Sequence, residues 1–313
     1  MSKLAVRGNE RTLESLAATV AREGFQRTLL FSGPDGVGRR QAAAWLAAFL
    51  NCLASPEERP CGVCASCQAV AARESLDHRE VTPHTTSRSG RSRHRSEIRI
   101  GQLVPREKDD EPDPLVPWLE ARPFGRYRVG VIDDAHTMNA SAANAFLKTL
   151  EEPPERAVIV LIAPGPETLM PTVASRALNF RFAAVPLGDG DFMDHPAARL
   201  GQPGLAERAV ENREATEAAR AAAVALLESV EGDLLQALEG AEDLAKTLGS
   251  SEIEGAEPGP LGWLRESLRS LPPAVYARAL DDLGDLEDAL AAYANPGLAC
   301  ASFALSLRSA LSS

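Results

Sequence analysis

The chain has 313 residues, of which 44% are hydrophobic, and a formal net charge of −11. This length predicts two or three hydrophobic cores, and the acidic balance argues against a free-standing DNA-binding module, because non-specific duplex affinity comes mainly from Lys and Arg. No stretch has the roughly 18 unbroken apolar residues of a membrane span, and the N-terminal segment lacks the apolar core of a signal peptide, so we expect a cytoplasmic protein with no membrane partner.

Residues 27–182 alternate apolar strands with helices, the pattern of an α/β domain with a mainly parallel sheet. Strands are expected at 28–32, 127–133, 157–163 and 177–182, and helices at 39–51 and 140–154. The third strand, AVIVLIA, is apolar throughout and is therefore expected to be central. The second helix has Ala142, Phe146 and Leu150 on one face and should stop at Pro153 and Pro154.

The turn between the first strand and the first helix has the glycine spacing of a phosphate-binding loop. Gly33, Gly36 and Gly38 fit G-x-x-x-x-G-K-[ST], but Arg39 and Arg40 stand at the Lys and Ser/Thr positions. A guanidinium is broader than the ammonium that reaches the phosphates, and a second cation would repel Mg²⁺ rather than ligate it. We expect no hydrolysis here and leave idle ATP or ADP binding open; a glycine-rich turn unrelated to nucleotides is the alternative.

The second apolar strand ends on Asp133 and Asp134, where a Walker B element would place a Mg²⁺-holding carboxylate and a water-activating one. A strand that simply ends in solvent is the alternative. The acidic pair follows the glycine-rich turn by about a hundred residues, and the two elements would meet at the carboxyl edge of one sheet. Together they favour an ATPase-like fold.

Four of the five cysteines, Cys52, Cys61, Cys64 and Cys67, lie within sixteen residues. In a reducing cytosol this spacing favours a metal site over two disulfides. Four thiolates suit tetrahedral zinc and leave no open position, so we predict a structural zinc module at 52–67. Free cysteines or an iron–sulfur cluster are the alternatives, and Cys300 is interpreted as a small core residue.

Two later regions differ from the α/β pattern. The basic run near 87–99 is interpreted as a solvated loop, with a DNA or partner contact as the alternative, and we assign it no role. From residue 183 onward the strands stop, and alanine-rich helical segments flank a linker-like stretch at 250–260. The second half is therefore expected to be all-α.

The run IDDAHTMNASAANAFLKTLEEPPE, with PTVASR after the next strand, resembles the AAA+ clamp-loader subunits of bacterial DNA replication. The cysteine spacing, the altered loop and YANPGLACASFALSL favour the delta-prime branch of that family. The resemblance implies an AAA+ nucleotide-binding-like domain with the zinc module at 1–182, a helical lid at 183–249 and a helical collar for oligomerisation at 250–313.

The resemblance also implies a function. A delta-prime-type subunit is a non-hydrolysing stator in a ring that loads the sliding clamp onto primer–template DNA, and its partners are the gamma/tau motor subunits and the delta subunit. Arg176 in TVASR matches the family's Ser-Arg-Cys motif except for Ala177, and would be an arginine finger acting in trans on a neighbour. A surface arginine is the alternative. Gly204 stands where motor subunits carry a lid arginine.

Two other functions are weighed. An active ATPase motor of the same fold would need the Lys and Ser/Thr that Arg39 and Arg40 replace. A zinc-dependent nucleic-acid-binding regulator would need a basic face around the cysteines, yet the intervening LASPEERP is mixed in charge.

Overall fold

The computed structural model describes the chain in ranges separated by gaps, and divides it into two compact units. Unit 1 is Met1–Pro186 with Gly201–Pro203, and unit 2 is Leu187–Leu200 with Gly204–Ser313. Among the residues described, no helix is long and apolar enough to cross a membrane. The described residues are 4, 6, 8–86, 92–106, 113–185, 202, 204–205, 209–210, 212–250, 253, 256, 259–291 and 294–311.

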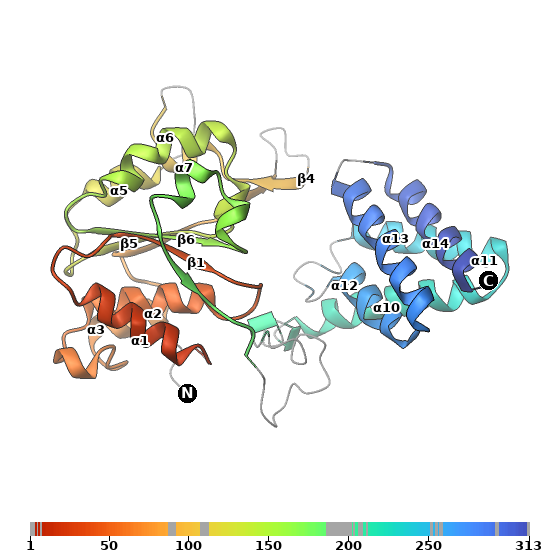
Figure 1. The fold of residues 1–313 in the computed structure, drawn as a ribbon, viewed down its shortest axis with the longest axis horizontal. Coiled ribbons are helices and arrows are strands. Elements are labelled where there is room, and N and C mark those ends of the chain that lie inside the picture. Colours follow the sequence, from red (N-terminus) through yellow and green to blue (C-terminus); the bar gives the residue numbers. More distant parts are fainter. Residues whose placement is uncertain are drawn as a thin grey trace. The chain divides into compact units, whose positions relative to one another are not determined.

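Unit 1 is built on a parallel five-stranded sheet with the order β2-β5-β6-β1-β7 (Figure 1). Its strands are β1 (Thr28–Ser32), β2 (His78–Val81), β5 (Arg128–Ile132), β6 (Ala157–Ala163) and β7 (Leu178–Arg181). β6 is buried at every position and lies in the middle, as its apolar sequence predicts. Two further strands, β3 (His84–Thr86) and β4 (Ser92–Glu97), pair antiparallel in a separate sheet.

Helices cover both faces of the five-stranded sheet, with α1, α2 and α3 on one side and α5, α6 and α7 on the other (Figure 1). Alternating strand residues feed two cores: Phe31 and Val160 pack with the first set of helices, and Leu30 and Leu161 with the second. The helices of unit 1 are α1 (Glu10–Val20), α2 (Arg39–Asn51), α3 (Ala65–Ala71), α4 (Ile100–Leu103), α5 (Leu115–Glu120), α6 (Ala140–Glu151) and α7 (Pro171–Ala174), with short 3-10 turns η1 (Pro56–Glu58), η2 (Ala135–Thr137) and η3 (Pro166–Thr168).

Helix α6 forms as its sequence predicts. The side chain of Asn139 accepts the Ala142 N–H at 2.9 Å and caps the first turn, and the helix ends at Glu151, before the two prolines. Ala142, Phe146 and Leu150 are buried in the second core. This packing fixes where the last turn of α6 lies, at the amino end of β6.

The described part of unit 2 is helical. α10 and α11 share one hydrophobic core with the helices that follow them, and Cys300 is buried in that core as expected. The division of this half into a lid and a collar stays a prediction. Its helices are α10 (Arg213–Glu231), α11 (Leu234–Leu248), α12 (Pro260–Ser267), α13 (Pro273–Ala291) and α14 (Pro296–Leu311), with the 3-10 turn η5 (Leu268–Ser270).

Two strand regions differ from the sequence prediction. β2 was not anticipated, because three of its four residues are polar or charged and only Val81 is buried. The basic region 87–99 expected as a loop contains β4, which pairs with β3 just before that region, while residues 87–91 between the two strands lie outside the described part of the chain.

Candidate functional site

The glycine-rich turn follows β1 at the carboxyl edge of the sheet and leads into α2. Gly33, Gly36 and Gly38 have φ angles of +144°, +72° and +94°, which favour glycine. A Cβ on Gly33 would lie 2.1 Å from the carbonyl oxygen of Phe182, and the Gly33 N–H donates to the carbonyl of Pro164 at 3.0 Å. The contacts within the fold therefore require glycine at position 33.

Arg39, at the lysine position of the motif, is used inside the loop. Its side chain is 7% exposed, and Nη1 donates to the carbonyl oxygen of Ala163, the last residue of β6, at 2.5 Å. Nη2 pairs with the carboxylate of Asp35 within the same turn. These contacts hold the guanidinium against the end of the central strand.

Arg40, at the Ser/Thr position, joins the start of α2 to two strands. Its Nε donates to Oε2 of Glu80 on β2 at 2.6 Å, and Nη2 pairs with the same carboxylate. Nη1 lies 3.5 Å from Oδ2 of Asp133, directly after β5. A guanidinium therefore sits beside the carboxylate that a Walker B element would direct at Mg²⁺.

The pKa values of this cluster reflect burial and charge together. Burial alone would lower the pKa of Arg40, but the hydrogen bond and charge of Glu80, with the charges of Asp133 and Asp134, outweigh burial and raise it. Burial raises the pKa of Asp133, and the carboxylates of Asp134 and Glu80 add to that rise, against the opposing charge of Arg40. Arg40 is thus a cation shared by a carboxylate-rich site.

Asp134 begins the η2 turn. Its backbone has a φ of +51°, which aspartate tolerates better than most residues, and its N–H donates to Oδ1 of Asp133 at 3.1 Å. The hydroxyl of Thr137 donates to its carbonyl at 2.8 Å. Both predicted acidic residues therefore lie at the carboxyl edge of the sheet, the edge from which the glycine-rich turn also extends.

Arg176 lies at the opposite edge, between α7 and the start of β7. Its carbonyl accepts the side-chain amide of Gln26, just before β1, at 2.7 Å. β1 is about 16 Å long at 3.3 Å per residue, and it separates this edge from the glycine-rich turn. The structure thus brings Arg40 and Asp133 together at one edge of the sheet and leaves Arg176 at the other.

The four clustered cysteines converge as their spacing predicts. Their sulfur atoms all lie within 4.8 Å of one another, and the Sγ atoms of Cys52 and Cys64 are 4.0 Å apart. Sulfurs on a tetrahedral zinc with ~2.3 Å bonds are ~3.8 Å apart. The N–H groups of Cys61 and Cys64 donate to the sulfurs of Cys52 and Cys61 at 3.4 and 3.3 Å. The donor set fits a four-coordinate zinc ion, and all four cysteines are free thiols in the structure.

The thiols differ in acidity. Burial would raise the pKa of Cys64, but N–H donors such as that of Leu53 and the neighbouring thiols lower it to about 6. Burial raises the pKa of Cys67 to about 12, with further rises from Cys64 and Cys52. Thiolates this close repel one another, and a divalent cation would relieve that repulsion.

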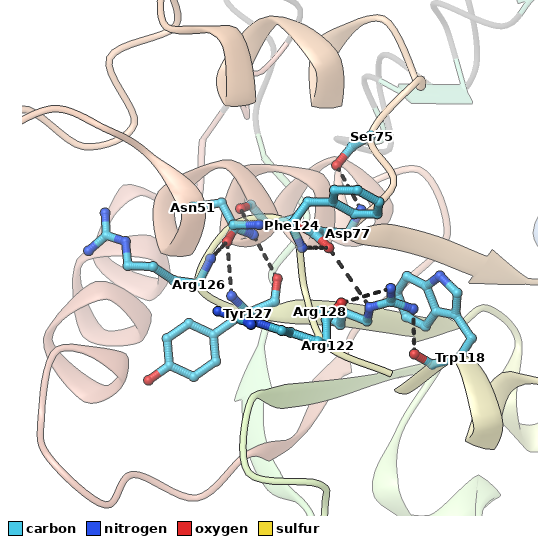
Figure 2. A network of polar contacts seen from close by, with 11 residues as sticks. Asn51, Ser75, Asp77, Trp118, Arg122, Phe124, Arg126, Tyr127 and Arg128 are labelled. Atoms are coloured by element: carbon cyan, nitrogen blue, oxygen red, sulfur yellow. Dashed lines mark hydrogen bonds and ion pairs between the residues drawn. The ribbon is translucent and has the colours of Figure 1, made fainter. Parts of the chain in front are cut away.

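Asn51, the residue before the cysteine module, ties it to the segment leading into β5 (Figure 2). Its buried side-chain amide both accepts and donates hydrogen bonds to the backbone of that segment. Oδ1 accepts the N–H groups of Arg126 and Tyr127 at 2.7 and 3.0 Å, and Nδ2 donates to the carbonyl of Tyr127 at 2.9 Å. Arg126 in turn donates from Nη2 to the carbonyl of Cys52.

Asp77, which lies after the module in the sequence, also contacts the segment that leads into β5 (Figure 2). Oδ1 and Oδ2 accept the N–H groups of Phe124 and Gly125 at 2.9 and 2.5 Å. Arg128 lies with Nε 3.9 Å from Asp77 Oδ1 and its guanidinium 4.9 Å from the centre of the Trp118 ring. Asn51 before the cysteine module and Asp77 after it are thus both hydrogen-bonded to residues 124–127.

Sequence reasoning missed several of these residues. Glu80 lies in a polar segment that has no strand pattern, and its pairing with Arg40 joins residues forty positions apart. Asn51 carries one usable signal, because it is a polar residue directly before the cysteine module, whereas Asp77 lies ten residues after Cys67 and has no such signal. Gly204 lies within the described residues, but half of the segment 201–206 lies outside them.

Comparison with known proteins places this geometry in context. Residues 8–186 match the family model described as DNA polymerase III, delta subunit. The gamma/tau subunit of DNA polymerase III from Mycobacterium tuberculosis is 32% identical over 181 residues, 57% of this chain and 28% of that protein. The tau subunit from Escherichia coli is 34% identical over 179 residues, 57% of this chain and 25% of that protein. The chain thus spans about a quarter of the length of these curated relatives.

Among solved structures, a DNA polymerase III gamma-subunit-related protein from Thermotoga maritima is similar. Its TM-score is 0.51 at 17% identity, over 95% of this chain and 99% of that chain. At this identity the likeness establishes a shared fold, and it extends through the helical half.

Proposed function

The chain belongs to the DNA polymerase III delta subunit family, and on that basis we propose that it is a non-hydrolysing AAA+ subunit of the delta-prime type in a bacterial replicative clamp loader. In this role it helps to assemble the ring that loads the sliding clamp onto primer–template DNA. Its partners are the gamma/tau motor subunits and the delta subunit, in the cytoplasm.

One observation carries the non-hydrolysing part of the proposal. Arg40 lies where the motif has a metal-binding hydroxyl, and its guanidinium contacts Glu80 and approaches Asp133 at 3.5 Å. A Mg²⁺ ion at this carboxylate would meet a fixed positive charge. Arg39 is bonded to Ala163 and Asp35, so neither arginine does the work of the P-loop lysine and hydroxyl.

The position of Arg176 supports the proposal that it is a finger acting in trans. It lies at the edge of the sheet opposite its own glycine-rich turn, and its side chain is 31% exposed. An arginine that contacts a neighbour's transferring phosphoryl group raises the rate by ~10³ to 10⁵ in NTPases generally. In this proposal the chain supplies that charge while its neighbour supplies the nucleotide site.

The cysteine cluster has a structural role in this proposal. Cys52, Cys61, Cys64 and Cys67 would hold one zinc ion, and four thiolates leave no position for a reacting water. When bound, the ion supplies a cross-link between the end of α2 and α3. It takes no part in chemistry at the loop.

The proposal is tested by ATP turnover of the isolated chain. We expect none above background with Mg²⁺ present, because the cationic site does not retain the metal. Asp133→Asn is the control for contaminating ATPases, since it removes the carboxylate that any hydrolysis at this site would need. Steady turnover in the wild type that Asp133→Asn abolishes would overturn the stator role; weak nucleotide binding would not, because the turn can still offer N–H donors.

A second candidate is an active motor subunit of the same fold. It is favoured by the names of the relatives, since proteins 32% and 34% identical to this chain are gamma/tau and tau subunits. The turnover assay separates the two candidates directly. A further comparison is the double substitution Arg39→Lys with Arg40→Ser, which restores the motif: turnover gained only in that variant supports the stator proposal.

A further inference from the structure

Arg176 is held to its own chain at three points, and one of them comes from a distant helix. Its backbone carbonyl accepts the Gln26 amide at 2.7 Å. Nη1 donates to the carbonyl oxygen of Thr172, one turn earlier, at 2.8 Å, and Nη2 lies 3.4 Å from Oε2 of Glu151, the last residue of α6. We propose that Glu151 is a positioning residue for Arg176, which orients its guanidinium toward the neighbouring nucleotide; this rests on the finger role proposed above.

The contacts leave the guanidinium suited to an oxyanion. Arginine carries five N–H donors, one on Nε and two on each Nη. Nε of Arg176 is buried and has no hydrogen-bond partner within the described structure, while Thr172 and Glu151 each engage one Nη. One donor remains on each Nη, so the guanidinium can still donate to phosphate oxygens.

The location of Glu151 is unfavourable for its own helix. A negative charge in the last turn of a helix faces the negative end of the helix dipole, which is unfavourable. Glu151 is also 63% exposed, and an ion pair so exposed contributes little to stability. The pair with Arg176 therefore affects where the guanidinium points more than whether the chain folds.

A fixed guanidinium has a kinetic advantage over a mobile one. An unrestrained arginine side chain has many rotamers, and this freedom is lost when the side chain is ordered in the transition state. Gln26 fixes the backbone of Arg176, and Thr172 and Glu151 fix its far end. Binding a neighbour's phosphate can then use the donor left on each Nη and keep both contacts in place.

The test compares Glu151→Gln with Glu152→Gln in the reconstituted clamp-loader complex. Glu152 is the next residue, is also exposed, and loses the same charge when substituted. We measure clamp- and DNA-stimulated ATP hydrolysis over a range of ATP concentrations, with assembly verified on the same samples. We expect Glu151→Gln to lower kcat about 3- to 10-fold and to change KM for ATP less than about twofold, with Glu152→Gln at the wild-type rate. Glu151→Asp should recover part of the loss.

Arg176→Ala and the double variant separate the two proposals. If Glu151 acts through Arg176, adding Glu151→Gln to Arg176→Ala causes no further loss. If Arg176→Ala lowers the rate while Glu151→Gln and Glu152→Gln behave alike, the positioning inference is overturned and the finger role stands. A rate above wild type in Glu151→Gln also overturns it, because Glu151 would then restrain the finger. A wild-type rate in Arg176→Ala overturns the finger role itself.

Discussion

Arg40 provides the most local test of the account, because its charge lies among carboxylates. In Arg40→Ala, Glu80 and Asp133 lose their shared cation, and the pKa of Asp133, already raised by burial, rises further. A raised carboxyl pKa stabilises the folded state at low pH and costs stability as the pH rises through it. The loss should therefore be about 1 kcal/mol at pH 7, a value discounted for the half-exposed arginine, and smaller at pH 4, where a carboxyl with a raised pKa is largely protonated.

Unfolding in urea measures this effect. A Trp263→Phe background leaves Trp45 and Trp118, both in unit 1, as the fluorescent reporters. Arg40→Lys is the matched control, because it keeps the charge and should retain part of the stability at pH 7. An equal loss at both pH values, or no loss, would show that Arg40 does not compensate these carboxylates.

At the scale of elements, the sequence predicted the parts of unit 1 whose burial leaves an apolar pattern. β1, β5, β6 and β7 were expected. β6 was expected to be central because its sequence is apolar throughout, and it is the middle strand with every position buried. β2 could not be predicted in this way, because it is an edge strand with a partly exposed surface.

The candidate site residues likewise include some that the sequence predicts and some that only the fold brings together. Gly33, the cysteine cluster and the acidic strand end are visible as spacings in the sequence. The pairing of Arg40 with Glu80 and of Arg176 with Glu151 depends on which elements the sheet brings together, and no local pattern carries that information.

The cysteine module is the element whose cofactor can be tested by itself. We expect about one zinc per chain in protein purified without added metal, and less after Cys64→Ser, because three thiolates hold the ion less well. The same change should lower the midpoint of thermal unfolding of unit 1 by about 5 °C or more. The loss should spread to the segment before β5, since Asn51 and Arg126 link that segment to the module.

Cys300→Ala is the control for the metal measurement. Cys300 is buried in the core of unit 2, where burial raises its thiol pKa to about 11, and its loss should leave the zinc content unchanged. Elemental analysis and calorimetry on the same preparations give both quantities. Iron in place of zinc, or no metal at all, would refute the zinc assignment.

At the scale of the whole molecule, the proposed function separates two roles that motor subunits combine. The glycine-rich edge of the sheet carries its own guanidinium beside Asp133, and Arg176 lies at the other edge. In this proposal the chain binds its neighbours in the ring, and the Arg176 side chain contacts the nucleotide bound by one of them. Arg176→Ala should leave assembly intact, because one exposed side chain contributes little to a large interface.

The stimulated ATPase of complexes that differ only at Arg176 tests this claim most directly. We predict that a fully assembled Arg176→Ala complex hydrolyses ATP more slowly and loads fewer clamps, because the transition-state charge at one site loses its stabilising cation, while the other motor sites keep theirs. Arg176→Lys should rescue poorly, since an ammonium lacks the two-pronged donor geometry. Wild-type hydrolysis and loading by a fully assembled Arg176→Ala complex would contradict the proposal that this chain serves its neighbour's site.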